Sequence, residues 1–569
     1  MTTNTPPPGA ADGPEYLGSA EATGDPTYFG TGPGGGRSWG ILAGVTVAVL
    51  AVVGLGGWGA FTLLSGGGSQ PSEAFPADTI GYVSIDLDPA ADQKIEGLSI
   101  LRKFPGIEKE LDISDRDDLR RYVFEKIQDE GECKDVDYEE DIAPWIGDRL
   151  GVGAVPQGED DVAALVALQV TDQEAAPAGL DALARCGGGG DAEFGYVFSG
   201  DYAVITETTK QARLLADEAA EGSLADDETF QARMSEVGDS GIVTMYASAD
   251  APDYLVDLQE SMFAVPDAGV QTVSAEPLSE QGVVLTSGPI APGSDQMPDE
   301  MTEQLKKLYA DFEGMAGVVR FEDGAVEFEF AAAGMPSGLP GGSTDEGTGV
   351  TELPASTGAA MALALPDNWL EEYLRQISAV MGEGMSIDEM LSQLEQESGL
   401  SLPEDVETLL GDNVAIAVDA DTDFEALESS EDGRELLAGI KVQGEPEEIL
   451  PIVEKIKAKI GPEADRLVVE DGDGVVAFGL NPDYVEGLLS EGDLGDEESF
   501  QDVVPDAEDA SSVFYVNFDA GDGWALELAE QAGEGAPEAK ENVEPLDALG
   551  LSTWVDDDVQ HALFRMTTD

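Results

Sequence analysis

Short stretches in which apolar and polar residues alternate recur along the chain and predict β-strands with one buried face. Val326, Phe328 and Phe330, for example, alternate with two glutamates, which gives this stretch an inner apolar side and an outer polar side. Between such stretches apolar residues return at helical spacing, as they do along one stripe of residues 449–460. Strands with one polar face, mixed with helices, indicate an α+β fold with largely antiparallel sheets.

The same patterns occur twice in the chain. Four segments of the first half recur in order in the second half: 75–87 with 353–365, 140–155 with 404–419, 224–231 with 494–501, and 317–330 with 550–563. Repeated segments in conserved order predict two tandem homologous α+β domains, at residues 75–333 and 351–569. In this alignment His561 takes the place of Phe328 on an inward-facing side of a strand.

Residues 39–64 form an apolar run without a charged side chain. About 20 such residues cross a bilayer as a helix, so the run predicts one transmembrane span. A buried core helix and a cleaved signal peptide are the alternatives. Flanking glycines oppose the core helix, and the signal peptide would need an N-terminal basic region, which residues 1–36 lack. Arg37 precedes the run, which places the N-terminus in the cytoplasm and the later residues outside.

Composition divides the remainder of the chain. Residues 1–38 are rich in proline and glycine and predict a disordered cytoplasmic tail. Residues 65–74 and 334–350 are rich in glycine and serine and predict linkers on either side of the first repeat.

The charge of the chain restricts its partners. It carries 117 acidic and 27 basic side chains, a formal net charge of −90. Nucleic acid and anionic lipid are both repelled by such a surface. We expect the acids to cover solvent-facing positions and to keep an exported protein soluble, and the alternative is a binding site for a basic partner.

Cysteine and histidine are too scarce for most metal chemistry. One histidine and two cysteines exclude most zinc, haem and iron–sulfur sites, so we expect no cofactor and no metal site. Cys133 and Cys186 lie in the first repeat, and in an oxidising exterior they predict a disulfide; two unrelated buried thiols are the alternative. His561 is interpreted as a hydrogen-bonded core histidine.

Three short motifs suggest chemistry, but each departs from what that chemistry needs or has a simpler interpretation; the first and the third are interpreted as turns. The sequence Gly-Asp-Ser-Gly at 238–241 lacks a neighbouring histidine base. The acids at 419, 421 and 423 begin like a calcium loop but lack its glycine and its last glutamate. Residues 556–558 are three aspartates at a predicted hairpin tip, where weak binding of divalent cations is the alternative to solvated turn charges. No catalytic residue is therefore predicted, and we expect a protein that is not an enzyme.

The segment PADTIGYVSIDLDPAADQKIEGLSILRKFPG at residues 76–106, together with the tail and the apolar run, resembles an uncharacterised actinobacterial family of single-span, membrane-anchored exported proteins. The resemblance covers roughly residues 36–569. It implies attachment to the cell membrane and no catalytic residues.

Three functions remain open. The first is a non-catalytic envelope protein that binds an unknown partner or supports structure. The second is a carrier or sensor of an apolar ligand held between the two repeats. The third is a carboxylate-dependent hydrolase of envelope polysaccharide, which would need two carboxyl groups about 5–9 Å apart in a cleft.

Overall fold

The structure is a computed structural model. It describes residues 69–86, 136–158, 161–184, 194–238, 241–254, 309–322, 324–335, 347–381, 387–430, 432–490, 492–521, 523–530 and 536–569, together with 97, 99, 100, 103, 104 and 121. The described residues from 69 onward belong to one compact unit. The predicted span at 39–64 lies outside them, and no helix within them is long and apolar enough to cross a membrane.

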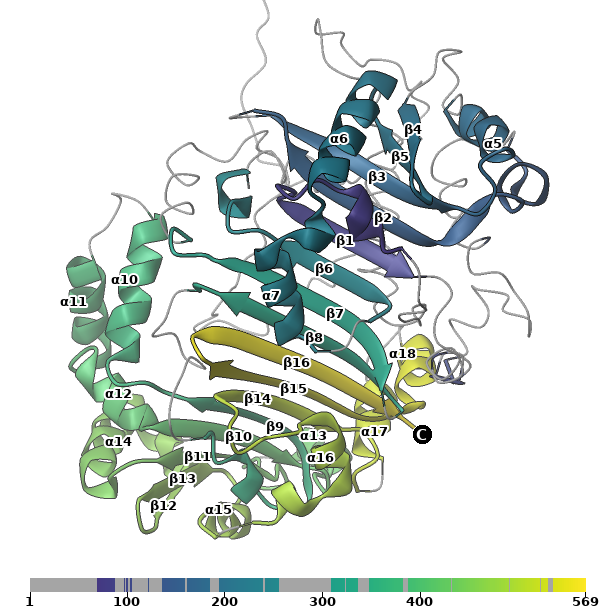
Figure 1. Cartoon of the computed structure of the whole chain (residues 1–569). Coiled ribbons are helices and arrows are strands. Elements are labelled where there is room, and N and C mark those ends of the chain that lie inside the picture. The colour runs from purple at the N-terminus through teal and green to yellow at the C-terminus, as the bar shows by residue number, and fades with distance from the viewer. Residues whose placement is uncertain are drawn as a thin grey trace, which may run out of the picture. The chain divides into compact units, whose positions relative to one another are not determined.

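The core of the fold is a sheet of 16 strands, in which every described pairing is antiparallel (Figure 1). Its strands are β1 Gly81–Asp86, β2 Ile146–Pro156, β3 Val162–Val170, β4 Gly195–Ser199, β5 Tyr202–Thr206, β6 Val243–Ala247, β7 Gly314–Glu322, β8 Ala325–Ala333, β9 Thr357–Ala364, β10 Asn413–Asp419, β11 Ala438–Gln443, β12 Val468–Asp471, β13 Val475–Gly479, β14 Ser512–Asn517, β15 Leu546–Asp556 and β16 Val559–Thr568. The predicted α+β class with antiparallel sheet is thus confirmed.

The order of the strands is the same in both halves of the chain. From one edge the sheet runs β12-β13-β11-β10-β9-β14-β15-β16, and from the other edge it runs β4-β5-β3-β2-β1-β6-β7-β8. Strands β16 and β8 pair in the middle, with His561 opposite Ala331. A single sheet therefore passes through both halves of the chain.

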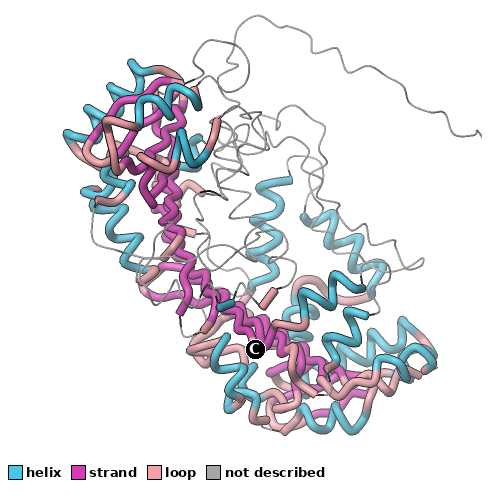
Figure 2. Tube along the Cα trace, turned by 90° about the vertical axis from the view of Figure 1, so that its right-hand side faces the viewer, coloured by secondary structure: helices cyan, strands magenta, loops and turns pink. Residues whose placement is uncertain are grey.

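Helices cover both sides of this sheet, which Figure 2 shows along its edge. The α-helices are α5 Ala176–Leu183, α6 Thr209–Glu221, α7 Glu228–Glu236, α10 Trp369–Met381, α11 Ile387–Ser398, α12 Glu404–Leu410, α13 Phe424–Ser429, α14 Pro446–Ile460, α15 Pro482–Leu488, α16 Glu498–Val503, α17 Trp524–Glu530 and α18 Ala536–Val543. We call face A the side of the sheet that carries Tyr82, Arg320 and Tyr515, and face B the side that carries Ile85 and Phe514; strand register assigns each residue to its side.

Each face has its own apolar cores. On face A, α6 and the short helices η1 Pro71–Ala74 and η3 Leu224–Asp226 pack on the first half, and α15 and α16 pack on the second. On face B, α5 and the π-helix η2 Tyr138–Ile142 cover the first half. The last part of the predicted linker 65–74 thus belongs to the fold, because η1 is packed into a core.

Helix α14 illustrates how sequence directs these contacts. Pro446 occupies its first turn, and Gly461 ends it with a φ of 84°. The apolar stripe that was predicted along residues 449–460 is buried at Ile449, Ile452 and Val453.

The β7–β8 and β15–β16 hairpins occupy equivalent places in the two halves, and their strand registers shift the sequence alignment of the two repeats by one residue. In β7–β8 Arg320 is opposite Glu327, and in β15–β16 Trp554 is opposite His561. Both hairpins close with a two-residue loop, so His561 occupies the position of Glu327 and not that of Phe328. The inner and outer sides of β8 were also predicted wrongly: Glu327 is buried, because it is ion-paired, whereas Phe328 is only half-buried.

Candidate functional site

Face B carries no charge over most of the sheet. In the regularly paired segments of β13, β11, β10, β9, β14, β15, β16, β8, β7, β6 and β1, every described residue on this face is uncharged. Face A of the same strands carries ionised side chains, among them Lys441, Arg320 and Glu327. In a chain with a net charge of −90, this separation of charged and uncharged faces marks face B as an apolar surface.

One row of side chains on face B crosses strand after strand in direct register. The row consists of Phe478, Ile440, Ile416, Met361, Phe514, Leu551, Phe564, Phe328, Val319, Val243, Ile85 and Leu150. Neighbouring strands lie about 4.8 Å apart, so each member contacts the next.

The two halves of this row differ in exposure. In the first half Ile85 and Val243 are buried in one core cluster that also contains Ile100, Phe104 and Trp145. In the second half five consecutive members, which we call the apolar strip, are 37–42% exposed: Ile440, Ile416, Met361, Phe514 and Leu551. Soluble monomers seldom expose large contiguous apolar patches, and such patches mark binding sites.

The apolar strip lies between two packed clusters at opposite ends of its strands. One cluster joins α14 and Trp369 to Leu363 and Val414, two residues along from the strip. The other joins α13 and α17 to Ala359 and Val516, two residues along in the other direction. Figure 1 shows α10, α12 and α14 at one end of these strands and α13 and α17 at the other. The strip is therefore one side chain wide between its flanking clusters.

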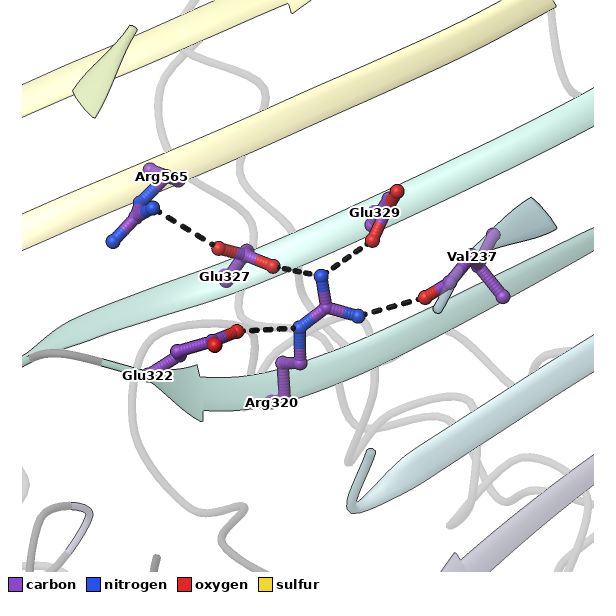
Figure 3. A network of polar contacts seen from close by, with 6 residues as sticks. All are labelled: Val237, Arg320, Glu322, Glu327, Glu329 and Arg565. Carbon is purple, nitrogen blue, oxygen red and sulfur yellow. Dashed lines mark hydrogen bonds and ion pairs between the residues drawn. The ribbon is translucent and has the colours of Figure 1, made fainter. Parts of the chain in front are cut away.

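Face A holds a network of buried ion pairs in the middle of the sheet (Figure 3). Arg320 on β7 forms ion pairs with Glu327 and Glu329 on β8, and its Nε lies 3.1 Å from Glu322. Arg565 on β16 lies 3.4 Å from Glu327. The network thus ties the first half of the chain to the second half across the β8–β16 pairing.

Burial and pairing oppose each other at Glu327. Burial raises the pKa of this carboxyl, and the guanidinium groups of Arg320 and Arg565 lower it by less. Arg320 also donates a hydrogen bond to the carbonyl oxygen of Val237, at 2.8 Å. Because its charges are paired with one another and Arg320 also binds the backbone of Val237, we interpret this network as structural.

His561 is buried, as predicted, but the structure gives it a different environment. Its ring stacks on Trp554 at 5.0 Å between centroids and 8° between planes. The predicted hydrogen bond is not found at Nδ1, which has no partner among the described residues.

The acids at 419, 421 and 423 connect the end of β10 to the start of α13. Asp419 accepts a hydrogen bond from the backbone of Asp421, and Asp423 caps α13 by accepting one from Ala426. Within the described ranges no group of three or more His, Cys, Asp or Glu residues could hold a metal ion. Asp557 and Asp558 form the β15–β16 turn, as predicted for 556–558. Asp239, Ser240 and both cysteines of the predicted disulfide, Cys133 and Cys186, lie outside the described residues.

Two surface pockets are less suited to binding than the apolar strip. The larger, about 570 Å³, is lined by acidic loop residues such as Glu352, Asp493 and Asp509. A smaller one of about 300 Å³ lies on face A beside Tyr82 and Arg149. Arg149 is held there by Asp86 at 2.8 Å and by the carbonyl oxygen of Ser69 at 2.9 Å. The polar groups of this smaller pocket are therefore already hydrogen-bonded to one another.

Sequence reasoning missed the apolar strip. The repeated segment 353–365 contains Met361, but alternation alone predicts burial of the apolar side of such a strand. Its exposure depends on the helices that follow β9, which pack at the end of the strands. Comparison with protein-family models, with curated proteins and with solved structures finds no match for this chain.

Proposed function

We propose that this chain is a membrane-anchored, extracytoplasmic protein without catalytic activity that binds an apolar partner on the apolar strip. The observation that carries the proposal is the exposure of five adjacent apolar side chains on a face without charged residues. Full burial of one large apolar side chain is worth about 1.5–3 kcal/mol, so a partner that covers the strip gains substantial free energy.

The predicted anchor and the repeat complete this proposal. Residues 39–64 hold the protein in the cell membrane with residues 1–38 in the cytoplasm and the sheet outside. The shared strand order supports an origin of the sheet from two tandem homologous copies, 75–333 and 351–569. The first copy buries Ile85 and Val243 of face B in its own core, and the second covers the two ends of its strands but leaves the apolar strip between them exposed.

A carrier or sensor of an apolar ligand is the second candidate. The same strip favours it, but as an open surface on the second repeat and not as a cavity between the repeats.

A fourfold variant tests whether the strip is a binding surface. Full-length protein in nanodiscs should bind a neutral apolar dye such as Nile red in a saturable way, above the uptake of empty nanodiscs. Replacing Met361, Ile416, Phe514 and Leu551 by threonine keeps strand propensity and should abolish this additional binding. Because these side chains are partly exposed, each substitution should cost at most about 0.5 kcal/mol, and the free energy of unfolding of the variant should lie within about 2 kcal/mol of the wild type.

Two outcomes would contradict the proposal. Unchanged dye binding by the fourfold variant would place the binding elsewhere. A loss of several kcal/mol in stability would show that the strip is a covered core. The matched control replaces Leu214 and Ile460, which are 47% and 55% exposed on α6 and α14, by glutamine; it should bind dye like the wild type.

A further inference from the structure

We infer that the partner of the apolar strip is the hydrocarbon chain of an uncharged lipid, which lies across the strands. This inference rests on the proposed function and adds the chemical class of the ligand. Three observations carry it: the shape of the strip, the distribution of charge and the position of the first described residue.

The strip has the dimensions of a single extended hydrocarbon chain. From Ile440 on β11 to Leu551 on β15 it crosses four strand-to-strand steps, or about 19 Å. One lipid chain occupies half of the ~30 Å hydrocarbon core of a bilayer, or about 15 Å.

The width of the strip favours a chain over a peptide helix. Packed cluster residues lie two positions away along each strand, for example Leu363 and Ala359 on either side of Met361. At the rise of a strand, each of these flanking residues lies about 7 Å from the strip residue between them. Side chains of neighbouring helices already pack on the flanking residues. A helix with its side chains is about 10–12 Å wide, nearly the whole of the ~14 Å between the two flanking positions, so it would contact both clusters, whereas a single hydrocarbon chain fits between them.

The charge distribution selects an uncharged lipid. Face B offers neither a cation for an anionic headgroup nor an anion for a cationic one on its regularly paired strands. The chain as a whole carries a net charge of −90, which repels anionic headgroups from its surroundings.

The fold begins close to the predicted membrane span. The carbonyl oxygen of Ser69 accepts hydrogen bonds from Arg149 at 2.9 Å and from the hydroxyl of Tyr202 at 2.7 Å, which fixes this residue to the sheet. The predicted span ends at residue 64, and five residues reach at most about 18 Å. The first half of the sheet is thus tethered close to the bilayer that would supply the ligand, although Ser69 itself lies on face A of that half and not beside the strip.

Photolabelling tests the ligand class at the level of residues. Full-length protein in phosphatidylcholine nanodiscs is illuminated with either of two probes that carry the same diazirine-bearing acyl chain, a neutral diacylglycerol and an anionic phosphatidylglycerol. Adducts are then located by peptide mass spectrometry. We expect the neutral probe to label the peptides of β9, β10 and β14 several-fold more than the anionic probe. The fourfold threonine variant should lose this labelling, and the control with Leu214→Gln and Ile460→Gln should keep it.

The possible failures are distinguishable. Equal labelling of the strip by both probes would overturn the selection for an uncharged lipid. Absence of adducts from the strip with both probes, while Nile red still depends on the strip, would overturn the lipid assignment and leave the proposed function standing. Loss of both signals would overturn the two together.

Discussion

At the scale of single residues, equivalent positions in the two halves use different chemistry to fill the same space. Arg320 and Glu327 form an ion pair across the β7–β8 hairpin, and at the equivalent places Trp554 and His561 stack across β15–β16. The ion pair includes a carboxyl that is only 3% exposed, and a buried charge is tolerated only while its partners remain.

Loss of the buried carboxyl should therefore be costly. We expect Glu327→Ala to destabilise the fold by about 3 kcal/mol, because Arg320 and Arg565 would lose a buried counter-ion. Glu322→Ala removes a carboxyl of the same network that is half exposed, and should cost less than about 1 kcal/mol. Urea unfolding followed by tryptophan fluorescence measures both, and equal effects would show that burial does not determine the cost.

The interaction of Asp519 with Asp569 allows a prediction of how the stability of the fold depends on pH. Partial desolvation of Asp519, whose side chain is still exposed, and then the hydrogen bond and charge of Asp569 raise its pKa to about 6. An acid with a raised pKa in the folded state holds its proton better there than in the unfolded chain. Its contribution to stability is complete below about pH 4 and is lost as the pH rises through about 6.

Removing this acid should flatten that part of the pH profile. Asp519→Asn should melt like the wild type near pH 4 and be more stable at pH 7.5. The gain should stay below about 1 kcal/mol because Asp519 is exposed to solvent. Thermal melts at both pH values measure it, and an unchanged difference between them would refute the assignment.

At the scale of elements, the β15–β16 hairpin shows strain that its sequence does not relieve. Its turn residues Asp557 and Asp558 both have positive φ, 45° and 69°, as a type I′ turn requires. Asparagine and glycine adopt these angles more readily than aspartate, and two adjacent carboxylates repel each other. The equivalent turn of β7–β8 places Gly324 at its second position.

A substitution in this turn should therefore stabilise the protein. We expect Asp557→Asn with Asp558→Gly to raise the free energy of unfolding by about 0.5–1.5 kcal/mol, mainly by removing backbone strain. Gly324→Ala should act in the opposite direction, by about 1 kcal/mol. Denaturant titration of the two variants tests the turn type, and stabilisation by Gly324→Ala would contradict it.

The same elements show which features can be predicted from sequence. The alternation in β9 and β10, the stripe of α14 and the hairpin tip at 556–558 follow from local chemistry, and the structure has them. The inner side of β8 was predicted wrongly, because alternation cannot show that Glu327 is buried in ion pairs with two arginines. The exposure of Phe514 was also beyond prediction, since it depends on where distant helices pack.

At the scale of the whole sheet, charge is separated by side. Face A carries the ion pairs and is covered by helices in both halves, whereas face B is uncharged on most strands and, in the second half, stays exposed along the apolar strip between two packed clusters. Covering an apolar sheet face is the ordinary requirement of a stable fold, so an uncovered one calls for a partner.

Methionine oxidation tests most directly whether this face is open. Met361 and Met566 both lie on face B, 42% and 3% exposed, and hydrogen peroxide oxidises methionines according to their access to solvent. In the full-length protein we predict that Met361 reacts at least about tenfold faster than Met566, and that a saturating neutral lipid slows it toward the rate of Met566. Equal, slow oxidation of both residues without lipid would show that the strip is already covered, and would contradict this account.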